Sequence, residues 1–338
     1  YHQHFPEPVG KERLNMMKRL LTYSLTMICA LVMVGCSGRG NGKSTAFQPH
    51  AFPPIPEPPA VIAEPQEKAE YVISNYWNKF LSKAYPCDTN VVNGVLADDL
   101  EKAFGTYVTF LEGTCPIDFA RKAMAGFFDR VEKFQASDTS SNVFAFFEKM
   151  VPKYLYDPNS PVRNEDLYLP YVSRLAVSEY SDPDLKPSYS FETQMCSLNM
   201  IGSPAADFTF TDLSGRRHTL YSVKAETTLL FFTNPGCPAC KEIMESLTSD
   251  EEIAALVTSG RLAVVNIYID DELDKWREYA SVYPKNWYNG YDQSYIIRSD
   301  VTYNVRAIPS LYVLDSEKNV IMKDAPVEVV LPYLDNLK

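Results

Sequence analysis

The sequence predicts an all-α N-terminal domain followed by an α/β domain in which helices flank a mixed central sheet. Apolar residues recur at helical spacing between residues 66 and 198, whereas short apolar runs alternate with helical segments between residues 201 and 338. Strands that alternate with helices and end in an antiparallel hairpin form a mixed sheet. The 338 residues also exceed the length that one hydrophobic core usually serves, which favours two domains.

The N-terminal region predicts export and lipid attachment. Two basic residues precede an apolar run at 20–34 that is short for a bilayer span, and Gly35 places a small residue before Cys36. This pattern resembles a bacterial lipoprotein signal peptide over residues 16–35, and the resemblance implies that Cys36 is lipidated. An ordinary cleaved signal and an uncleaved anchor are the alternatives. Residues 1–15 precede the first methionine, and we expect them to be a mis-start.

Residues 36–65 predict a tether between the membrane and the folded domains. A Gly/Ser-rich stretch is followed by a proline-rich stretch, which favours a stiff, extended polyproline conformation and cannot build a core. The prolines of this segment are Pro49, Pro53, Pro54, Pro56, Pro58, Pro59 and Pro65.

Residues 66–198 predict a helical domain of unknown function. Apolar residues spaced three to four apart mark one face of several helices. These stripes comprise Ile73, Trp77, Phe80 and Ala84, then Ala120, Met124, Phe128 and Val131, then Val143, Phe146, Phe147 and Met150. Aromatic stripes at this spacing pack in cores far more often than they bind cofactors, and no catalytic constellation accompanies them.

Residues 201–338 predict the α/β domain. The expected hairpin and strands are 208–220, 228–233, 262–269, 311–314 and 320–322. The expected helices are 238–247, 251–257, 272–282 and 327–337.

The pair Cys237 and Cys240 predicts a redox site. It follows a buried strand and opens a helix, and a helix N-terminus stabilises the thiolate that attacks a disulfide. Pro238 suits the first helical turn, where its missing N–H is not needed. A structural zinc site would need further ligands beside this pair, and the remaining cysteines are scattered singly. A structural short-loop disulfide is the other alternative, although so tight a ring is usually labile.

The C-terminal part resembles the thioredoxin superfamily from about residue 201 onward, in particular its lipid-anchored periplasmic thiol–disulfide oxidoreductases and redoxin branch. The resemblance rests on the dithiol, on the segment 202–215 that looks like the opening hairpin of that branch, and on Ile308-Pro309 before an apolar strand. It implies that Cys237 is the nucleophile, that Cys240 resolves the mixed disulfide, and that Pro309 is cis.

The same resemblance implies a substrate groove shaped by Ile308, Pro309 and Pro238. The helical domain in turn resembles an uncharacterised domain found ahead of thioredoxin-like domains in some Gram-negative lipoproteins. Client proteins bearing disulfides or thiols, and a membrane protein that donates electrons, are the partners that these resemblances imply.

Three features of the sequence depart from thioredoxin itself. A buried acid often stands six residues before the first cysteine, and here this position holds Phe231, so the proton acceptor for Cys240 must be another group or water. Gly236 replaces the usual tryptophan before the first cysteine. The long spacing from Cys240 to the proline predicts an inserted helical segment around 271–283.

The other cysteines of the folded domains leave several possibilities open. Cys87 and Cys115 lie in the helical domain and can form a disulfide in an exported protein, or remain two isolated thiols. Cys196 is expected to be buried and inert, with a third exchange partner as the alternative, because reactivity needs an exposed electropositive setting.

Composition narrows the function further. The net charge is −11 and the pI is near 5.0, so the chain lacks the basic surface that nucleic acid requires. Taken together, the dithiol, the lipoprotein-like signal and the resemblances imply a thiol–disulfide oxidoreductase of the bacterial cell envelope. We expect it to be lipid-anchored and to face the periplasm, with no cofactor and no metal. A peroxiredoxin-like thiol peroxidase is an alternative, but Leu230 and Asn234 replace the proline and threonine of its motif. A redox-regulated binding lipoprotein is the third possibility.

Overall fold

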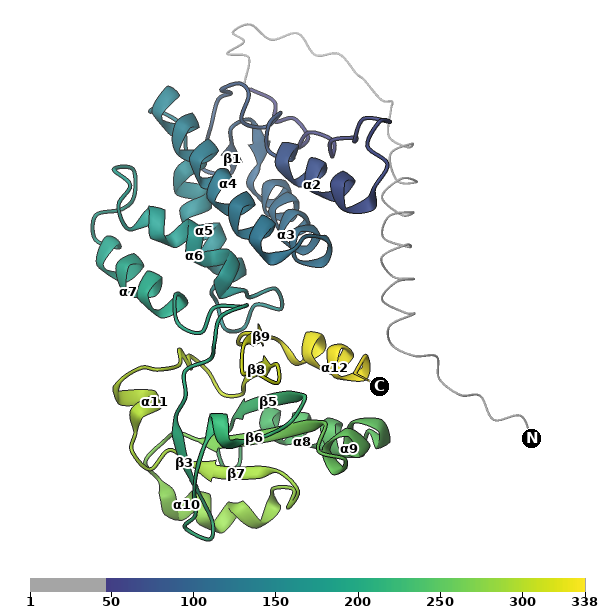
Figure 1. The fold of residues 1–338 in the computed structure, drawn as a ribbon. Coiled ribbons are helices and arrows are strands. Elements are labelled where there is room, and N and C mark those ends of the chain that lie inside the picture. Colours follow the sequence, from purple (N-terminus) through teal and green to yellow (C-terminus); the bar gives the residue numbers. More distant parts are fainter. Residues whose placement is uncertain (1–46, 338) are drawn as a thin grey trace, which may run out of the picture. The chain divides into compact units, whose positions relative to one another are not determined.

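A computed structural model describes residues 47–337, whose helices and strands are drawn in Figure 1. The expected mis-start at 1–15, the signal at 16–35, the lipidation site Cys36 and the first part of the tether all lie outside these residues. Within residues 47–337, no helix combines the length and the apolar character needed to cross a membrane.

The first part of the described chain is helical, as the sequence predicts (purple to teal in Figure 1). Its helices are α2 (Pro65–Asn75), α3 (Ala97–Thr114), α4 (Ile117–Ser137), α5 (Val143–Leu155), α6 (Glu165–Leu175) and α7 (Lys186–Cys196). Their apolar faces share one core, which explains the stripes at helical spacing that the sequence shows in α4 and α5.

A small hairpin interrupts this helical part, which the all-α prediction did not include. Strands β1 (Val91–Val92) and β2 (Val95–Leu96) pair antiparallel around a turn at Asn93-Gly94. Both turn residues have positive φ, 44° and 80°, which is the conformation that an Asn-Gly pair adopts in a two-residue hairpin.

Trp77 lies at the centre of the helical core. Its side chain is fully buried, and its ring contacts those of Phe104, Phe127 and Phe147 at centroid distances of 4.9–6.3 Å. Phe52, which the sequence analysis assigned to the tether, also packs against Trp77, at 5.5 Å. The last part of the expected spacer is therefore docked on the helical core, because it carries an aromatic residue among its prolines.

The second part is a seven-stranded mixed sheet flanked by helices (green to yellow in Figure 1). The strands are β3 (Thr209–Asp212), β4 (Arg217–Thr219), β5 (Thr227–Phe232), β6 (Leu262–Tyr268), β7 (Tyr288–Tyr291), β8 (Ser310–Leu314) and β9 (Val320–Met322). Their order across the sheet is β4-β3-β7-β6-β5-β8-β9. The helices are α8 (Pro238–Ser249), α9 (Glu251–Thr258), α10 (Leu273–Tyr279), α11 (Ile296–Ser299) and α12 (Val327–Asp335), with short 3-10 turns at Leu220–Ser222 and Ala280–Val282.

The sheet is buried on both faces. Successive residues of β5 point to opposite sides, so Leu229 and Phe231 enter one core while Leu230 and Phe232 enter the other. Strand β6 pairs parallel to β5 on one edge, and β8 pairs antiparallel to it on the other. This double burial explains the continuous apolar runs of β5, β6 and β8 in the sequence.

Most of the predicted elements of this part agree with the structure to within a few residues, and the inserted segment at 271–283 forms α10 and the 3-10 turn after it. Two elements were missed. Strand β7 lacks an apolar alternation, yet it joins β6 to β3, and α11 spans only four residues. Neither segment has a regular apolar pattern, so contacts with the rest of the fold decide its conformation.

The close packing around β7 gives a test of the fold. A Cβ atom at Gly290 would lie 2.5 Å from Cδ2 of Phe210 and 3.1 Å from the carbonyl oxygen of Thr211. We expect Gly290→Ala to lower the free energy of unfolding by about 1–3 kcal/mol, the usual cost of overpacking. Urea denaturation of the full chain would measure it.

Gly126 within α4 is the matched control, because a Cβ there meets nothing within 4 Å. We expect Gly126→Ala to raise the free energy of unfolding by about 0.5–1 kcal/mol through helix propensity. Equal effects of the two substitutions would contradict the packing described for β7.

Candidate active site

The carboxyl end of β5 carries the dithiol loop. Because β5 is buried and paired on both edges, Phe232 fixes the start of the following segment Thr233–Gly236. The backbone N–H of Thr233 continues the ladder to Ile267 at 3.1 Å, and the N–H of Cys237 closes a turn onto the carbonyl of Asn234 at 3.2 Å. Gly236 has φ +75°, which a side chain would strain, so this turn uses glycine where thioredoxin usually has tryptophan.

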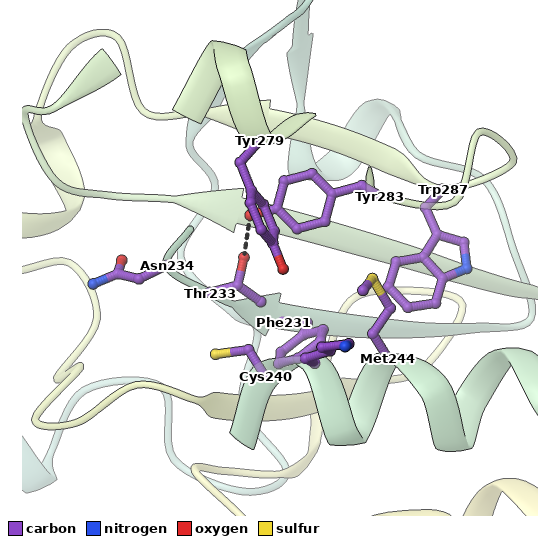
Figure 2. Close-up of a pocket in the computed structure, with 9 residues that line it drawn as sticks. Phe231, Thr233, Asn234, Cys240, Met244, Tyr279, Tyr283 and Trp287 are labelled. Carbon is purple, nitrogen blue, oxygen red and sulfur yellow. Dashed lines mark hydrogen bonds between the residues drawn. The ribbon is translucent and has the colours of Figure 1, made fainter. Parts of the chain in front are cut away.

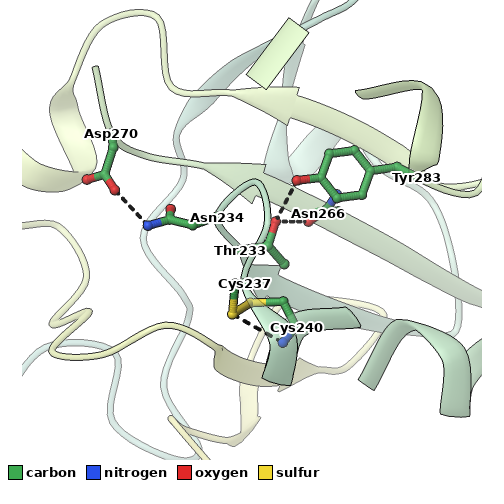
Figure 3. Close-up of a disulfide and its surroundings, with 7 residues drawn as sticks. All are labelled: Thr233, Asn234, Cys237, Cys240, Asn266, Asp270 and Tyr283. Carbon is green, nitrogen blue, oxygen red and sulfur yellow. Dashed lines mark hydrogen bonds between the residues drawn. A yellow bond between two sulfur atoms is a disulfide. The ribbon is translucent and has the colours of Figure 1, made fainter. Parts of the chain in front are cut away.

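Cys237 and Cys240 form a disulfide at the first turn of α8 (Figure 3). Cys237 caps the helix, and its Sγ accepts a hydrogen bond from the backbone N–H of Cys240 at 3.2 Å. Pro238 occupies the first helical position. Cys237 is half-buried whereas Cys240 is 6 % exposed, so the sulfur at the helix N-terminus is the accessible one. A helix N-terminus favours negative charge, which suits a thiolate at Cys237.

A layer of polar side chains lies beneath the dithiol. Thr233 donates its hydroxyl to Oδ1 of Asn266 at 2.6 Å, and its Oγ1 lies 3.5 Å from the hydroxyl of Tyr283. Asn266 donates in turn to Oδ1 of Asn289 at 3.0 Å. These side chains come from the residue after β5, from β6 and β7, and from the turn before β7, so the layer ties the dithiol loop to the sheet. Figure 3 shows Thr233, Asn266 and Tyr283 of this layer.

A second set of polar contacts holds the dithiol loop at Asn234. The amide of Asn234 donates to Oδ2 of Asp270 at 2.9 Å, and Asp270 forms an ion pair with Arg298. Asp270 follows the end of β6 and Arg298 lies on α11. The segments after β6 and β7 therefore help to place Asn234, which stands three positions before Cys237.

A small cavity lies against Cys240. Its volume is about 10 Å³, the size of one water molecule, and its lining includes Phe231, Thr233, Tyr283 and Trp287 (Figure 2). No carboxylate contributes to this lining, since Phe231 occupies the position of the acid in thioredoxin. Burial raises the pKa of the Tyr283 hydroxyl above its ordinary value, so this group donates hydrogen bonds at neutral pH and does not act as a base.

The segment Ile308–Pro309 reaches the same edge of the sheet. Its peptide bond is cis, the conformation predicted from the sequence. The next residue, Ser310, pairs with Phe232 at the end of β5, which places the proline level with Thr233. Ile308 also packs against the core cluster that holds both cysteines. The structure therefore brings the predicted groove residues and the dithiol to one end of the domain.

Of the two possibilities left open for Cys87 and Cys115, the structure shows two free thiols. Cys115 stands just before α4, whereas Cys87 donates to the carbonyl of Ser140, just after α4, at 3.3 Å. The 21 residues of α4 span about 30 Å, and a disulfide needs Cα atoms within about 7 Å.

Cys196 is fully buried at the end of α7. Burial raises the pKa of its thiol well above the ordinary value, which agrees with the expectation of an inert residue. Among residues 47–337, no three His, Cys, Asp or Glu side chains are grouped so that they could hold a metal ion.

A family model described as thioredoxin-like matches residues 225–320, and one described as a domain of unknown function (DUF5106) matches residues 35–197. A thioredoxin-like protein from Bacteroides caccae is 34% identical, with a TM-score of 0.71, over 84% of this chain and 98% of that protein. The chain belongs to the thioredoxin-like family.

Further solved structures match the C-terminal part of this thioredoxin-like chain. The C-terminal domain of an uncharacterized protein from Bacteroides fragilis is 44% identical over 40% of this chain and 98% of that domain, with a TM-score of 0.39. The thioredoxin domain of a thiol–disulfide oxidoreductase from Bacteroides vulgatus is 19% identical over 40% of this chain and 98% of that domain, with a TM-score of 0.35. No curated protein matches the chain.

The sequence analysis missed the polar layer around Thr233 and Asn266. One signal was present, because Asn266 is a single polar residue inside the apolar run of β6, and a buried amide requires partners. The partners Tyr283 and Asn289 belong to segments without a regular pattern, so they could not be predicted.

The geometry of the dithiol predicts unequal reactivity in the reduced protein. We expect iodoacetamide at pH 6 to label Cys237 at least roughly tenfold faster than the exposed thiol Cys87, because the helix N-terminus stabilises the Cys237 thiolate. Cys240 and Cys196 should remain unlabelled in the folded protein because they are buried. Peptide mass spectrometry at timed intervals would measure all four rates, and faster labelling of Cys240 would contradict the assignment of roles.

Proposed function

We propose that this thioredoxin-like protein is a thiol–disulfide oxidoreductase that exchanges disulfides with client proteins through Cys237 and Cys240. One observation carries the proposal. A half-buried cysteine caps the N-terminus of α8, forms a disulfide with a buried cysteine one turn later, and lies at the sheet edge where Ile308–Pro309 arrives. This arrangement supplies an accessible nucleophile, a resolving thiol and a groove for the client.

The exchange proceeds in two displacements. The Cys237 thiolate attacks one sulfur of the client disulfide, and the other client sulfur leaves as a thiolate. The Cys240 thiol then loses its proton and attacks the Cys237 sulfur, which releases the second client thiolate and leaves the Cys237–Cys240 disulfide. Two electrons pass to the client, and its two thiolates take up protons from water. An electron-donating membrane protein would reduce the Cys237–Cys240 disulfide back to the dithiol and so complete the cycle.

The surroundings of Cys240 define how its proton is transferred. With Phe231 in place of an acid, the lining of the cavity includes the hydroxyls of Thr233 and Tyr283 and no carboxylate. Neither is a base at neutral pH, but both can hydrogen-bond a water molecule in a cavity of this size. The proton of Cys240 would thus pass to solvent through water rather than to a side-chain carboxylate.

The client would bind as an extended segment. The loop before β8 lies beside the dithiol and ends in Ile308–Pro309, and exposed backbone groups of such a loop can pair with a client strand. Pro238 is exposed next to Cys237 and would form the opposite wall of this groove.

The proposed site of action is the bacterial cell envelope. The lipoprotein-like signal at residues 16–35 supports attachment through a lipid on Cys36, with the folded domains facing the periplasm. A disulfide in the folded protein is compatible with such an oxidising compartment.

Insulin reduction by the full chain with dithiothreitol tests the activity. Wild-type protein should accelerate precipitation of the insulin B chain, and Cys237→Ser should be inactive. Consumption of hydrogen peroxide without insulin reduction would favour the thiol peroxidase instead.

Removal of the resolving thiol should trap clients. We expect Cys240→Ser to accumulate mixed disulfides with client proteins, because the Cys237–client bond then has no intramolecular thiol to break it. Non-reducing gels of cells expressing each variant would show these adducts. Cys237→Ser is the matched control and should trap almost none, since Cys240 is buried. Equal trapping by both variants would refute the order of the two steps.

Removal of the proposed lipid should release the protein. We expect Cys36→Ala to leave the protein folded and in the soluble fraction after cell lysis, because no helix within residues 47–337 could hold it in a bilayer. Membrane pelleting followed by alkaline extraction would measure the distribution. A variant that still resists extraction would indicate an uncleaved N-terminal anchor.

A further inference from the structure

The loop that leads to the cis-proline is held by a residue of the helical domain. Glu165, the first residue of α6, accepts a hydrogen bond from the amide of Asn304 at 2.7 Å through Oε1. The same oxygen forms an ion pair with Nε of Arg306 at 2.9 Å. Asn304 and Arg306 stand four and two residues before Ile308, and residues 303–309 belong to neither a helix nor a strand. Two polar residues of this loop thus obtain a partner from the helical domain.

The Glu165 contacts are deeply buried. The carboxylate also pairs with Nζ of Lys323 at 2.9 Å, and the side chains of both residues are 1 % exposed. Lys323 donates two further bonds to the carbonyls of Cys196 and Leu198, at 2.7 and 2.6 Å, where α7 ends. A single carboxylate of the helical domain therefore pairs with two cations that come from the α/β domain.

The other side of the cis-proline is held through Asp324. Ser310, the residue after Pro309, donates its hydroxyl to Oδ1 of Asp324 at 2.7 Å. Arg163 of the helical domain binds the same residue, with Nε 3.0 Å from its carbonyl oxygen and 3.6 Å from Oδ2. Arg306 reaches Oδ2 of Asp324 as well, at 3.3 Å, which closes the network.

The guanidinium of Arg306 is also fixed by the helical domain on its outer side. It lies 4.1 Å from the centre of the Tyr156 ring and donates to the carbonyl of the same residue. Arg306 therefore contacts Glu165 and Tyr156 of the helical domain and Asp324 of the α/β domain. Its side chain is 12 % exposed.

We propose that the helical domain positions the client-binding loop 303–309, with Glu165 and Arg163 as the positioning residues on its two sides. The proposal rests on the proposed function, since it assigns to this loop the role of binding an extended client. A loop without ladder partners must be ordered before it can bind a peptide strand tightly, and contacts that order it in advance lower the cost of binding.

The neighbouring residue Asp166 offers a matched control. It is equally buried, at 1 %, and lies on the same turn of α6. Its carboxylate binds Arg121 and the backbone N–H of Ile201, and it makes no hydrogen bond or ion pair with residues 303–309. Asp166→Asn therefore removes a buried charge at the same place in the fold without touching the loop.

The test compares Glu165→Gln and Asp166→Asn in the full chain. We expect Glu165→Gln to lower kcat/KM for insulin about 10- to 100-fold, mainly through KM, because the groove loses its order. Reduction of hydroxyethyl disulfide, which is too small to need the groove, should be unchanged, as should the reduction potential of Cys237–Cys240. Asp166→Asn should lower the melting temperature by about as much as Glu165→Gln does. It should leave kcat/KM for insulin, the rate of hydroxyethyl disulfide reduction and the reduction potential at their wild-type values.

Hydrogen exchange provides a readout that does not depend on activity. Amides of residues 303–309 should lose protection in Glu165→Gln and retain it in Asp166→Asn. Unchanged protection, or equal kinetic effects of both variants, would overturn the positioning role. Wild-type protein that fails to reduce insulin, with protection still lost in Glu165→Gln, would instead overturn the proposed function.

Arg163 gives a second, milder variant in case Glu165→Gln does not fold. Arg163→Ala removes the contact with Asp324 at a side chain that is 15 % exposed. We expect it to raise KM for insulin and to loosen residues 303–309, and Arg163→Lys to restore part of both. Wild-type values in Arg163→Ala would count against the proposal.

Discussion

Strand β5 is buried on both faces and hydrogen-bonded on both edges, so its carboxyl end is held by two neighbouring strands at once. Each neighbour also brings part of the site to that end. The parallel strand β6 supplies Asn266 and leads to Asp270, and the antiparallel strand β8 begins directly after Pro309. The relative positions of the dithiol, the polar layer and the cis-proline thus follow from one set of strand pairings rather than from contacts among these groups alone.

The sequence predicted the parts of the fold that carry a strong pattern. Buried strands such as β5 and β6 appear as apolar runs, and α8 is marked by Pro238 after a capping residue, so the fold class is confirmed. Strand β7 could not be found, because Tyr288–Tyr291 is stabilised by its partners on both sides and not by its own composition. The β1–β2 hairpin was marked by Asn93-Gly94, a local turn signal that the helical interpretation overlooked.

Within the candidate site, the two cysteines were predicted because their chemistry depends on residue type and short spacing, and the cis-proline was implied by the resemblance to the thioredoxin superfamily. The side chains that support them were not predicted, since Thr233, Asn266 and Tyr283 meet only after three distant segments fold together. The state of Cys87 and Cys115 stayed open at the level of sequence for the same reason. Sequence gives the number of thiols but not the length of α4 that separates them.

The contacts of Glu165 and Arg163 with the α/β domain bear on the order in which the protein folds. Glu165 and Asn304 are 139 residues apart, and Arg163 and Asp324 are 161 apart. Contacts of such long range close long loops, so we expect them to form after the local contacts within the helices and hairpins. The loop beside the dithiol would therefore be the last segment to become ordered, and a newly made chain would acquire its client groove only when both domains are complete.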